Sequence, residues 1–228
     1  MKKIISILLL FFVSFSTFAQ GTINKKVQTA KADVDERSLK GDILIDVFEC
    51  DGDNGPYTGI DLRARKEASS DSLILMLKVK YEFESNEYFF VHPDSQAGFL
   101  DAMNMIHDKF VEWSEVAKKN KITDFKKPVP FDNNFTVYEY RVSYLKPQPR
   151  LMWADFIVNG KGKASIAIGF DERGGIGHYS DYDFYSADKI AHLIYIIQPD
   201  YVRTVYEQTK RRIAELQAAE QERSDLFQ

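Results

Sequence analysis

Apolar residues recur along this chain with two different spacings, and each spacing predicts a different element. In residues 73–83 every odd position is Leu, Val, Tyr or Phe, whereas positions 78, 80 and 82 are charged. A period of two predicts a strand with one buried face and one wet face, as in antiparallel sheets. Shorter strands are predicted at 43–48, 59–64 and 88–91, and turn residues at 51–56 would join the first two into a hairpin.

The second spacing runs along residues 94–120 and predicts a helix. An apolar stripe recurs there at steps of three and four, namely Phe99, Met103, Ile106, Phe110, Trp113 and Ala117. Asp94 or Ser95 is expected to cap the start of the helix. Lys118 and Lys119 suit the negative end of its dipole. One face of this helix is therefore expected to lie on a core.

The strand pattern returns in the second half of the chain. Residues 123–134, which include Pro128 and Pro130, are predicted to form a loop. Strands are predicted after it at 135–145, 151–158, 164–170 and 182–185. The turns between the first three are expected at 146–149 and 159–162.

Two helical segments are predicted at the end of the chain. Ser186 can cap the first, which ends or kinks at Pro199. The second carries an apolar stripe from Val202 to Leu216. After Leu216 the stripe fades into charge, so residues 217–228 are expected to be a solvated helix end.

Runs of strands followed by helices predict an α+β fold, in which antiparallel β-meanders carry helices packed on one face. We expect a single globular domain at 41–216. Its parts 41–120 and 133–216 follow the same order, so they could be a duplicated strands-then-helix unit. The alternative is that any α+β chain offers such an order, because the identity between the two parts is thin.

The first residues predict export. Lys2 and Lys3 precede an apolar run at 4–13, and Thr17 and Ala19 place small residues before a cut, which is the three-part secretory pattern. We expect residues 1–19 to be a signal peptide of Gram-negative type that is cleaved after Ala19. Residues 20–40 would form a flexible leader, and the product would be periplasmic or secreted. A membrane anchor is the alternative, but it needs about 20 apolar residues, roughly twice this run.

Composition narrows the range of functions. The chain has 228 residues and a formal net charge of −4, so a nucleic acid would find no general electrostatic attraction. The apolar fraction of 44% fits a folded core rather than disorder. Cys50 is the single cysteine, which excludes an internal disulfide.

The sequence contains no recognisable catalytic set. The patterns Gly-x-Ser-x-Gly, His-Glu-x-x-His and the phosphate-binding Gly-x-x-x-x-Gly-Lys are all absent. We therefore expect a non-enzymatic module of the bacterial cell envelope or exterior that binds a protein, peptide or glycan partner, with no cofactor, metal, nucleic acid or membrane span. Two alternatives stay open. One is a small hydrolase-like enzyme using a His/Asp loop, and the other is a carrier of an apolar ligand lined by Phe99, Met103, Phe110 and Trp113.

The most site-like segment is a glycine-rich loop near residue 178. His178, Tyr179, Asp181 and Tyr182 follow three glycines there, and loops carry function more often than cores do. We predict that these four residues contribute to binding. The alternative is that the glycines form a plain turn.

Two acidic residues flank the predicted turn at 51–56. Asp46 would face Asp61, as a metal-binding or proton-sharing pair, if the turn is centred on residues 53–54. Asp46 would face Arg63 in an ordinary ion pair if the turn is centred one residue later. Asn-Gly is the better turn dipeptide, so we favour the pair with Arg63. The turn also resembles the start of a calcium-binding loop, but two of the required ligand positions hold Gly and Leu.

Histidines and tyrosines offer two further hypotheses. Asp188 and His192 are four residues apart on a predicted helix and can touch as a surface pair. Tyr138, Tyr140 and Tyr144 share one face of a predicted strand and would suit a sugar, peptide or protein ligand if exposed. We favour the interpretation that these tyrosines pack beneath the helices.

Overall fold

The computed structural model describes residues 38–39, 41–49, 57–68, 70–81, 88–140, 146–170 and 182–225. The chain divides into two compact units. One is Gly41–Tyr206, and the other combines Met1–Lys40 with Glu207–Gln228. The short strand β1 (Ser38–Leu39) belongs to the second unit, whereas both sheets described next belong to the first.

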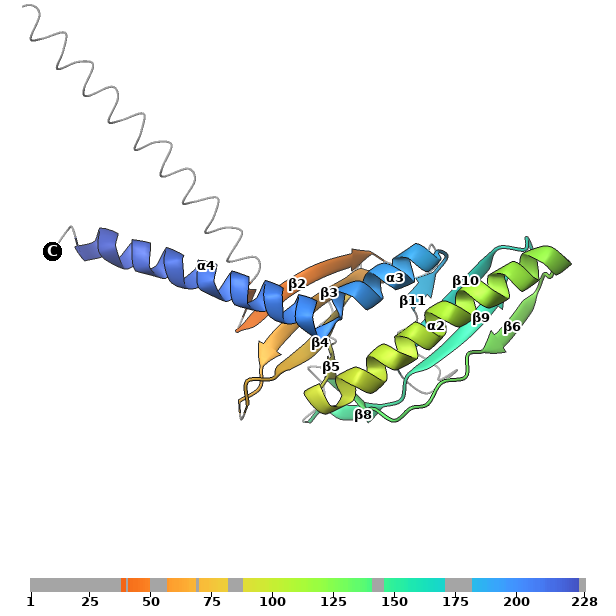
Figure 1. The fold of residues 1–228 in the computed structure, drawn as a ribbon, viewed down its shortest axis with the longest axis horizontal. Coiled ribbons are helices and arrows are strands. Elements are labelled where there is room, and N and C mark those ends of the chain that lie inside the picture. Colours follow the sequence, from red (N-terminus) through yellow and green to blue (C-terminus); the bar gives the residue numbers. More distant parts are fainter. Residues whose placement is uncertain are drawn as a thin grey trace, which may run out of the picture. The chain divides into compact units, whose positions relative to one another are not determined.

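The larger sheet of the first unit is an antiparallel meander with one crossover (Figure 1). Within the described residues its strands follow the order β2 (Asp42–Glu49), β3 (Tyr57–Lys66), β4 (Leu73–Tyr81), β5 (Tyr88–Val91), β7 (Val137–Tyr140) and β8 (Gln148–Arg150). The period-two segment that begins at residue 73 is thus confirmed as a strand. Leu73, Leu75 and Leu77 are buried, as its pattern predicts.

A second antiparallel sheet combines β6, which precedes β7 in the chain, with the three strands that follow β8. Its described strands are ordered β11 (Tyr182–Phe184), β10 (Ala164–Gly169), β9 (Trp153–Val158) and β6 (Phe125–Pro128). Strand β6 lies where a loop was predicted, so that prediction is wrong. The prolines at 128 and 130 suggested a loop, but Pro128 ends a strand at the edge of the sheet, where proline does not prevent pairing on the inner side.

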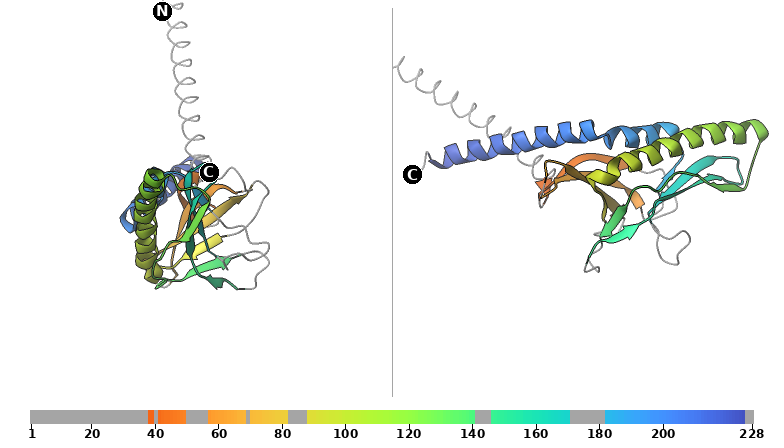
Figure 2. Two further views of the ribbon diagram at one scale, coloured as in Figure 1. Left: turned by 90° about the vertical axis from the view of Figure 1, so that its right-hand side faces the viewer. Right: turned by 60° about the horizontal axis from the view of Figure 1, so that its bottom comes forward.

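Two helices, α2 (Pro93–Asn120) and α3 (Ala187–Ile196), cover one face of these sheets (Figure 2). Helix α2 contacts β4, β5, β9 and β10, and α3 contacts β2, β11 and α2. Side chains from both sheets and both helices meet in one core, and the most completely buried include Leu62, Phe89, Met103, Phe156, Ile166 and Ile190. This is the α+β arrangement, with helices on one face, that the sequence predicts.

The stripe on α2 is confirmed, but its start is not where we expected. Phe99, Met103, Ile106, Phe110 and Ala117 are buried. The residue at the N-cap is His92, and Pro93 occupies the first helical position, where its missing N–H costs nothing. Asp94 lies in the first turn rather than at the cap. The helix ends at Asn120, and Lys121 closes it in a left-handed conformation with φ of 51°.

The C-terminal helices begin and end close to the predicted positions. Ser186 is the N-cap of α3, and α4 (Pro199–Asp225) starts at the predicted break. Val202 and Tyr206 of α4 are buried in the core of the first unit. Among the described helices, none has an apolar stretch long enough to cross a bilayer. Whether the two halves arose by duplication remains a prediction.

Candidate functional site

A pocket opens where the chain passes twice between the two sheets. Strands β6 and β9 pair in one sheet up to Pro128 opposite Asp155, and β7 and β8 pair in the other sheet from Val137 opposite Arg150. Between these two pairs lie the eight residues 129–136 on one side and the four residues 151–154 on the other. The first segment is four residues longer than the second, so the two segments cannot pair residue by residue. They therefore separate.

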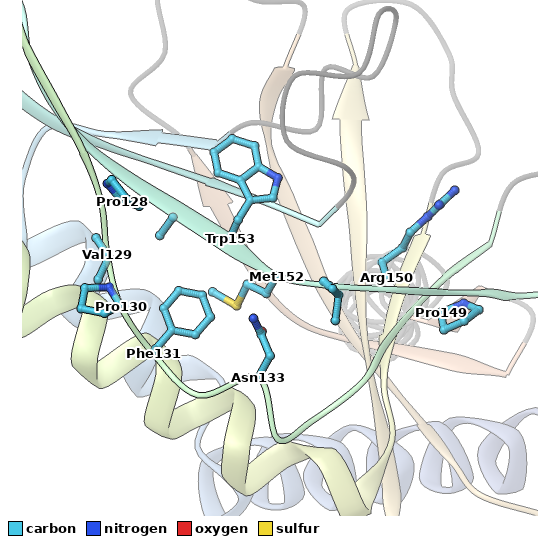
Figure 3. A pocket seen from close by; sticks show the side chains of 11 residues that line it. Pro128, Val129, Pro130, Phe131, Asn133, Pro149, Arg150, Met152 and Trp153 are labelled. Carbon is cyan, nitrogen blue, oxygen red and sulfur yellow. The ribbon is translucent and has the colours of Figure 1, made fainter.

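The separation leaves a pocket of about 610 Å³ (Figure 3). It is lined by Pro128, Val129, Pro130, Phe131, Asn133, Pro149, Arg150, Leu151, Met152, Trp153 and Ala154. Most of these side chains are apolar. This composition and volume are typical of a site that holds a ligand by shape and apolar contact.

The floor of the pocket belongs to the core. Val129, Met152 and Ala154 are at most 5% exposed, and Phe131 packs against the same core. In Figure 3 the side chains of Phe131 and Met152 point toward each other, whereas Trp153 points to the other side of the strand. A floor made of packed core residues is rigid, so the pocket is preformed rather than dependent on a moving loop.

The rim of the pocket carries an exposed leucine and unused backbone groups. Leu151 is 66% exposed, the highest value among the large exposed apolar residues of the described chain. The pairing of β6 with β9 ends close to Leu151. Its last hydrogen bond runs from the Val129 amide to the Ala154 carbonyl, at 2.9 Å. The backbone groups of Leu151 and Met152 make no hydrogen bond to another described residue. Those of Leu151 are therefore free for a ligand or for water, whereas Met152 is 2% exposed and its groups are unpaired at the buried floor.

A buried ion pair fixes one end of the pocket. Arg150 donates from Nε to the Glu139 carboxylate at 2.6 Å, and the side chain of Glu139 is 1% exposed. The guanidinium is engaged in this pair and keeps the end of β8 in place. Its role at the rim is therefore structural.

The sheet edges beside the pocket are protected against pairing with other chains. The edge strand β6 carries Lys126, Lys127 and Pro128, and the edge strand β8 carries Pro149. Lysine and proline at edges are common devices against unwanted strand addition. The unused backbone at Leu151 and Met152 has no such protection.

A second, smaller pocket lies at the start of α2. It measures about 390 Å³ and is lined by Glu67, His92, Pro93, Asp94, Ser95, Thr136 and Tyr138. Its polar groups bond to each other, because the Ser95 hydroxyl accepts from the Thr136 amide at 3.2 Å and donates to Asp94 at 3.3 Å. These groups hold the segment after β6 against the helix.

The predicted binding residues are not tested by this structure. His178, Tyr179 and Asp181 lie outside the described residues, as do Cys50 and the turn at 51–56. Tyr182 is placed by its backbone alone, as the first residue of β11 opposite Ile168. The binding role of these four residues stays a prediction.

The predicted pairings of Asp46 are both wrong. A bulge at Ile45 shifts the register of β2 against β3, so Asp46 lies opposite Leu62 and Asp61 lies opposite Val47. The carboxylate of Asp46 accepts hydrogen bonds from the Val47 amide at 2.8 Å and the Tyr201 hydroxyl at 3.0 Å. Neither Asp61 nor Arg63 is its partner.

Each described histidine contacts an aromatic ring or a carboxylate close to it. His92 occupies the N-cap position of α2 without a side-chain capping hydrogen bond and meets Tyr138 edge-on, and His107 contacts the neighbouring carboxylate of Asp108 at 3.2 Å. The ring of His192 stacks on Phe48 at 6.0 Å, and no ion pair links it to Asp188 in the described part of the chain. In the same ranges no three His, Cys, Asp or Glu side chains come together in a way that could hold a metal ion.

The tyrosines of β7 do not pack beneath the helices. Val137 and Glu139 face the core, at 0% and 1% exposed, so Tyr138 and Tyr140 point to the opposite face. Tyr140 is 37% exposed. The favoured interpretation is therefore wrong for these two residues, whereas Tyr144 lies outside the described ranges.

Comparison with known proteins adds no further identification. No family model, no curated protein and no solved structure matches this chain. The site is thus defined by its own geometry. Two features of the sequence could have indicated this pocket, namely the prolines at 128, 130 and 149 and the apolar residue Leu151 close to Pro149. The structure adds that Leu151 is exposed.

Proposed function

We propose that this chain is an exported, non-enzymatic binding module that holds an extended peptide segment of a partner protein in the pocket between the two sheets. The observation that carries the proposal is the opening between residues 129–136 and 151–154, where the backbone of residues 151–152 has no described hydrogen-bond partner and the Leu151 side chain is exposed. The export part rests on the N-terminal sequence pattern alone.

An extended peptide matches the unused groups of the opening. Strand-like ligands gain affinity from main-chain hydrogen bonds and specificity from side-chain pockets. Leu151 and Met152 supply donors and acceptors with no described partner, and the cavity between Phe131 and Met152 accepts an apolar side chain. A glycan would need several free polar side chains, but Arg150 is committed to Glu139.

Leu151 is the residue most suited to anchor a partner. Burying a leucine side chain contributes about 1.5–3 kcal/mol, and apolar anchors near the centre of an interface account for much of its affinity. In the free protein this contribution is not used, since two thirds of the residue is in water. A partner that covers it would gain that energy.

The packing of α2 supports this proposal over the carrier alternative. Phe99, Met103 and Phe110, which would line an apolar cavity, are at most 5% exposed. Phe99 meets Phe135 at 5.9 Å and Phe110 meets Phe156 at 6.2 Å, so these rings fill the space between helix and sheet. They are core residues, and the hydrolase alternative rests on the loop near residue 178.

Selection from a library of short random peptides tests the proposal. Peptides that bind the full chain are synthesised, and their affinity is measured for the wild type, for Leu151→Lys and for Val116→Lys. Val116 is an apolar residue on α2 that is 47% exposed and lies outside the pocket lining, so it controls for the added charge. We expect Leu151→Lys to weaken binding by about tenfold or more, and Val116→Lys to leave it unchanged. Equal affinity for both variants would exclude the pocket as the site.

A further inference from the structure

The face of the larger sheet turned away from the helices forms a regular grid of side chains. One row runs across four strands, from Arg63 to Met76, Phe90 and Tyr138. Residues opposite each other in adjacent strands point to the same face. Their neighbours Leu62, Leu77 and Phe89 are buried on the helix side, so this row belongs to the other face.

The second row of the grid lies directly beside the first. It contains Asp61, Lys78, Tyr88 and Tyr140. The rings of Tyr88 and Phe90 stack at 6.3 Å, and Phe90 meets Tyr140 edge-on at 6.4 Å. At the β7 end the rings are partly in water, and Tyr140 is 37% exposed. Toward β3 the face is closed, since Met76 of β4 is 2% exposed and Arg63 of β3 is 5% exposed.

Arg63 is an uncompensated charge at the closed end of this grid. The residue is 5% exposed, and its Nη1 is buried without a hydrogen-bond partner. No ion pair joins it to another residue of the described chain. A buried charge without a partner costs a large part of the net stability of a domain. Guanidinium groups in such positions are normally matched by a carboxylate or phosphate, which they bind through two parallel N–H donors.

Within the two rows of the grid, cations outnumber carboxylates. Lys78 is half-buried and lies opposite Asp61, the one carboxylate of the two rows. Asp61 has a further partner of its own. One carboxylate therefore stands against two cations, and an incoming anion meets a favourable potential that ends at Arg63.

We propose that this face is a second ligand site, in which Arg63 binds the carboxylate or phosphate group of a small molecule whose aromatic ring stacks on the rings of Tyr88, Phe90 and Tyr140. The aromatic residues supply an apolar surface of ring faces and edges on the same side of the sheet as the buried cation. Together they select an anion that carries an aromatic ring over a neutral ring or a bare anion. The site shares no residue with the pocket around Leu151, so the failure of one proposal leaves the other standing.

Titration of the full chain with four probes tests the site. Phenyl phosphate and benzoate carry both a ring and an anion, benzyl alcohol carries the ring alone, and inorganic phosphate carries the anion alone. All are compared at matched ionic strength by calorimetry and by the shift in thermal midpoint. We expect one or both ring-bearing anions to bind about tenfold or more tightly than benzyl alcohol or inorganic phosphate. The tighter of the two shows whether the natural anion is a phosphate or a carboxylate.

Three variants locate the binding. Arg63→Met should weaken the ring-bearing anion by about tenfold or more, and without ligand it should melt at or above the wild-type temperature, because the uncompensated charge is gone. Arg63→Lys keeps the charge but loses the two parallel N–H donors, so it should bind the ring-bearing anion more weakly than the wild type. This variant tests the proposal if Arg63→Met does not fold. Arg203→Met removes one exposed cation of α4 and should bind like the wild type. Equal affinity in the wild type and both Arg63 variants, or no binding of either ring-bearing anion, would overturn the proposal.

Discussion

The indole of Trp153 lies directly against Gly169, its partner across strands β9 and β10. A Cβ built at position 169 would come within 2.4 Å of the indole, whereas carbon atoms normally approach to about 3.5–4.0 Å. Glycine is therefore needed here so that the ring can rest on the backbone. Trp153 directly follows Met152 of the pocket floor, so this contact holds the start of β9 against β10 at the edge of the pocket.

Gly169→Ala tests this contact. The added methyl group must displace the indole, and we expect the free energy of unfolding to fall by about 1–3 kcal/mol, measured by urea denaturation. Gly160→Ala is the matched control, since its nearest atom is the flexible Asp124 carboxylate oxygen at 3.1 Å. The control should change stability by less than about 0.5 kcal/mol. Equal losses in both variants would show that the indole does not rest on Gly169.

The buried pair of Glu139 and Arg150 is expected to be important for stability. Arg150→Met leaves the Glu139 carboxylate, 1% exposed, without its 2.6 Å partner. Removing one member of a buried pair costs about 3–5 kcal/mol, and 24% exposure of the Arg150 side chain places the expected loss near the lower limit. Chemical denaturation measures it.

Lys66→Met is the surface counterpart of that substitution. The partner of Lys66 is Asp71, whose side chain is 89% exposed, so water replaces the lost contact. We expect a change of less than about 1 kcal/mol. If Arg150→Met were as mild as Lys66→Met, the pair would not be what holds β8 at the rim of the pocket.

Asp183 should make stability depend on pH. Burial raises the pKa of its carboxyl above the ordinary value, since desolvation disfavours the charged form. The folded chain therefore keeps this proton to higher pH than the unfolded chain, whose Asp pKa is about 3.9. Stability from this group falls as pH rises from the unfolded pKa through the folded pKa, and it stays low above that window.

Asp183→Asn removes this penalty. We expect the variant to be more stable than the wild type near neutral pH, and the advantage to disappear below about pH 3.9, where both forms of the wild type are protonated. Urea midpoints across that range measure the difference. Asp132→Asn, which changes an exposed loop carboxylate, is the charge-matched comparison. An advantage that persists unchanged in acid would show that burial of the charge is not its cause.

Export is tested on the mature chain itself. Expression of the full sequence in a Gram-negative host should give a periplasmic or secreted product that begins at Gln20, since Thr17 and Ala19 mark the cut. Intact mass and N-terminal sequencing of that product decide the point. A product that retains Met1 in the cytoplasm would contradict the prediction.

The fold could be predicted from the sequence because its elements are strongly periodic. The stripe on α2 and the alternation from residue 73 each have one dominant spacing. Strand β6 was missed because Pro128 and Pro130 suggested a loop, whereas proline is also found in edge strands. The register of Asp46 was missed because a one-residue bulge leaves no trace in the pattern.

The candidate site was not predictable for a related reason. The pocket exists because residues 129–136 face only residues 151–154, which depends on how strands far apart in the sequence pair. The sequence suggested Asp46 as the ion-pair partner of Arg63. The register of β2 against β3 instead places Asp46 opposite Leu62, which leaves Arg63 without that partner. Local patterns report which residues form strands, but they do not report which strands meet.

Amide hydrogen exchange at Leu151 and Met152 tests the proposed function most directly. In the free protein these two amides have no described hydrogen-bond partner, so they should exchange far faster than the amides within β9. A peptide selected on the full chain should slow exchange at one or both of them by about tenfold or more, with no comparable change on α2. Binding that leaves both amides unprotected would contradict strand-like docking in this pocket.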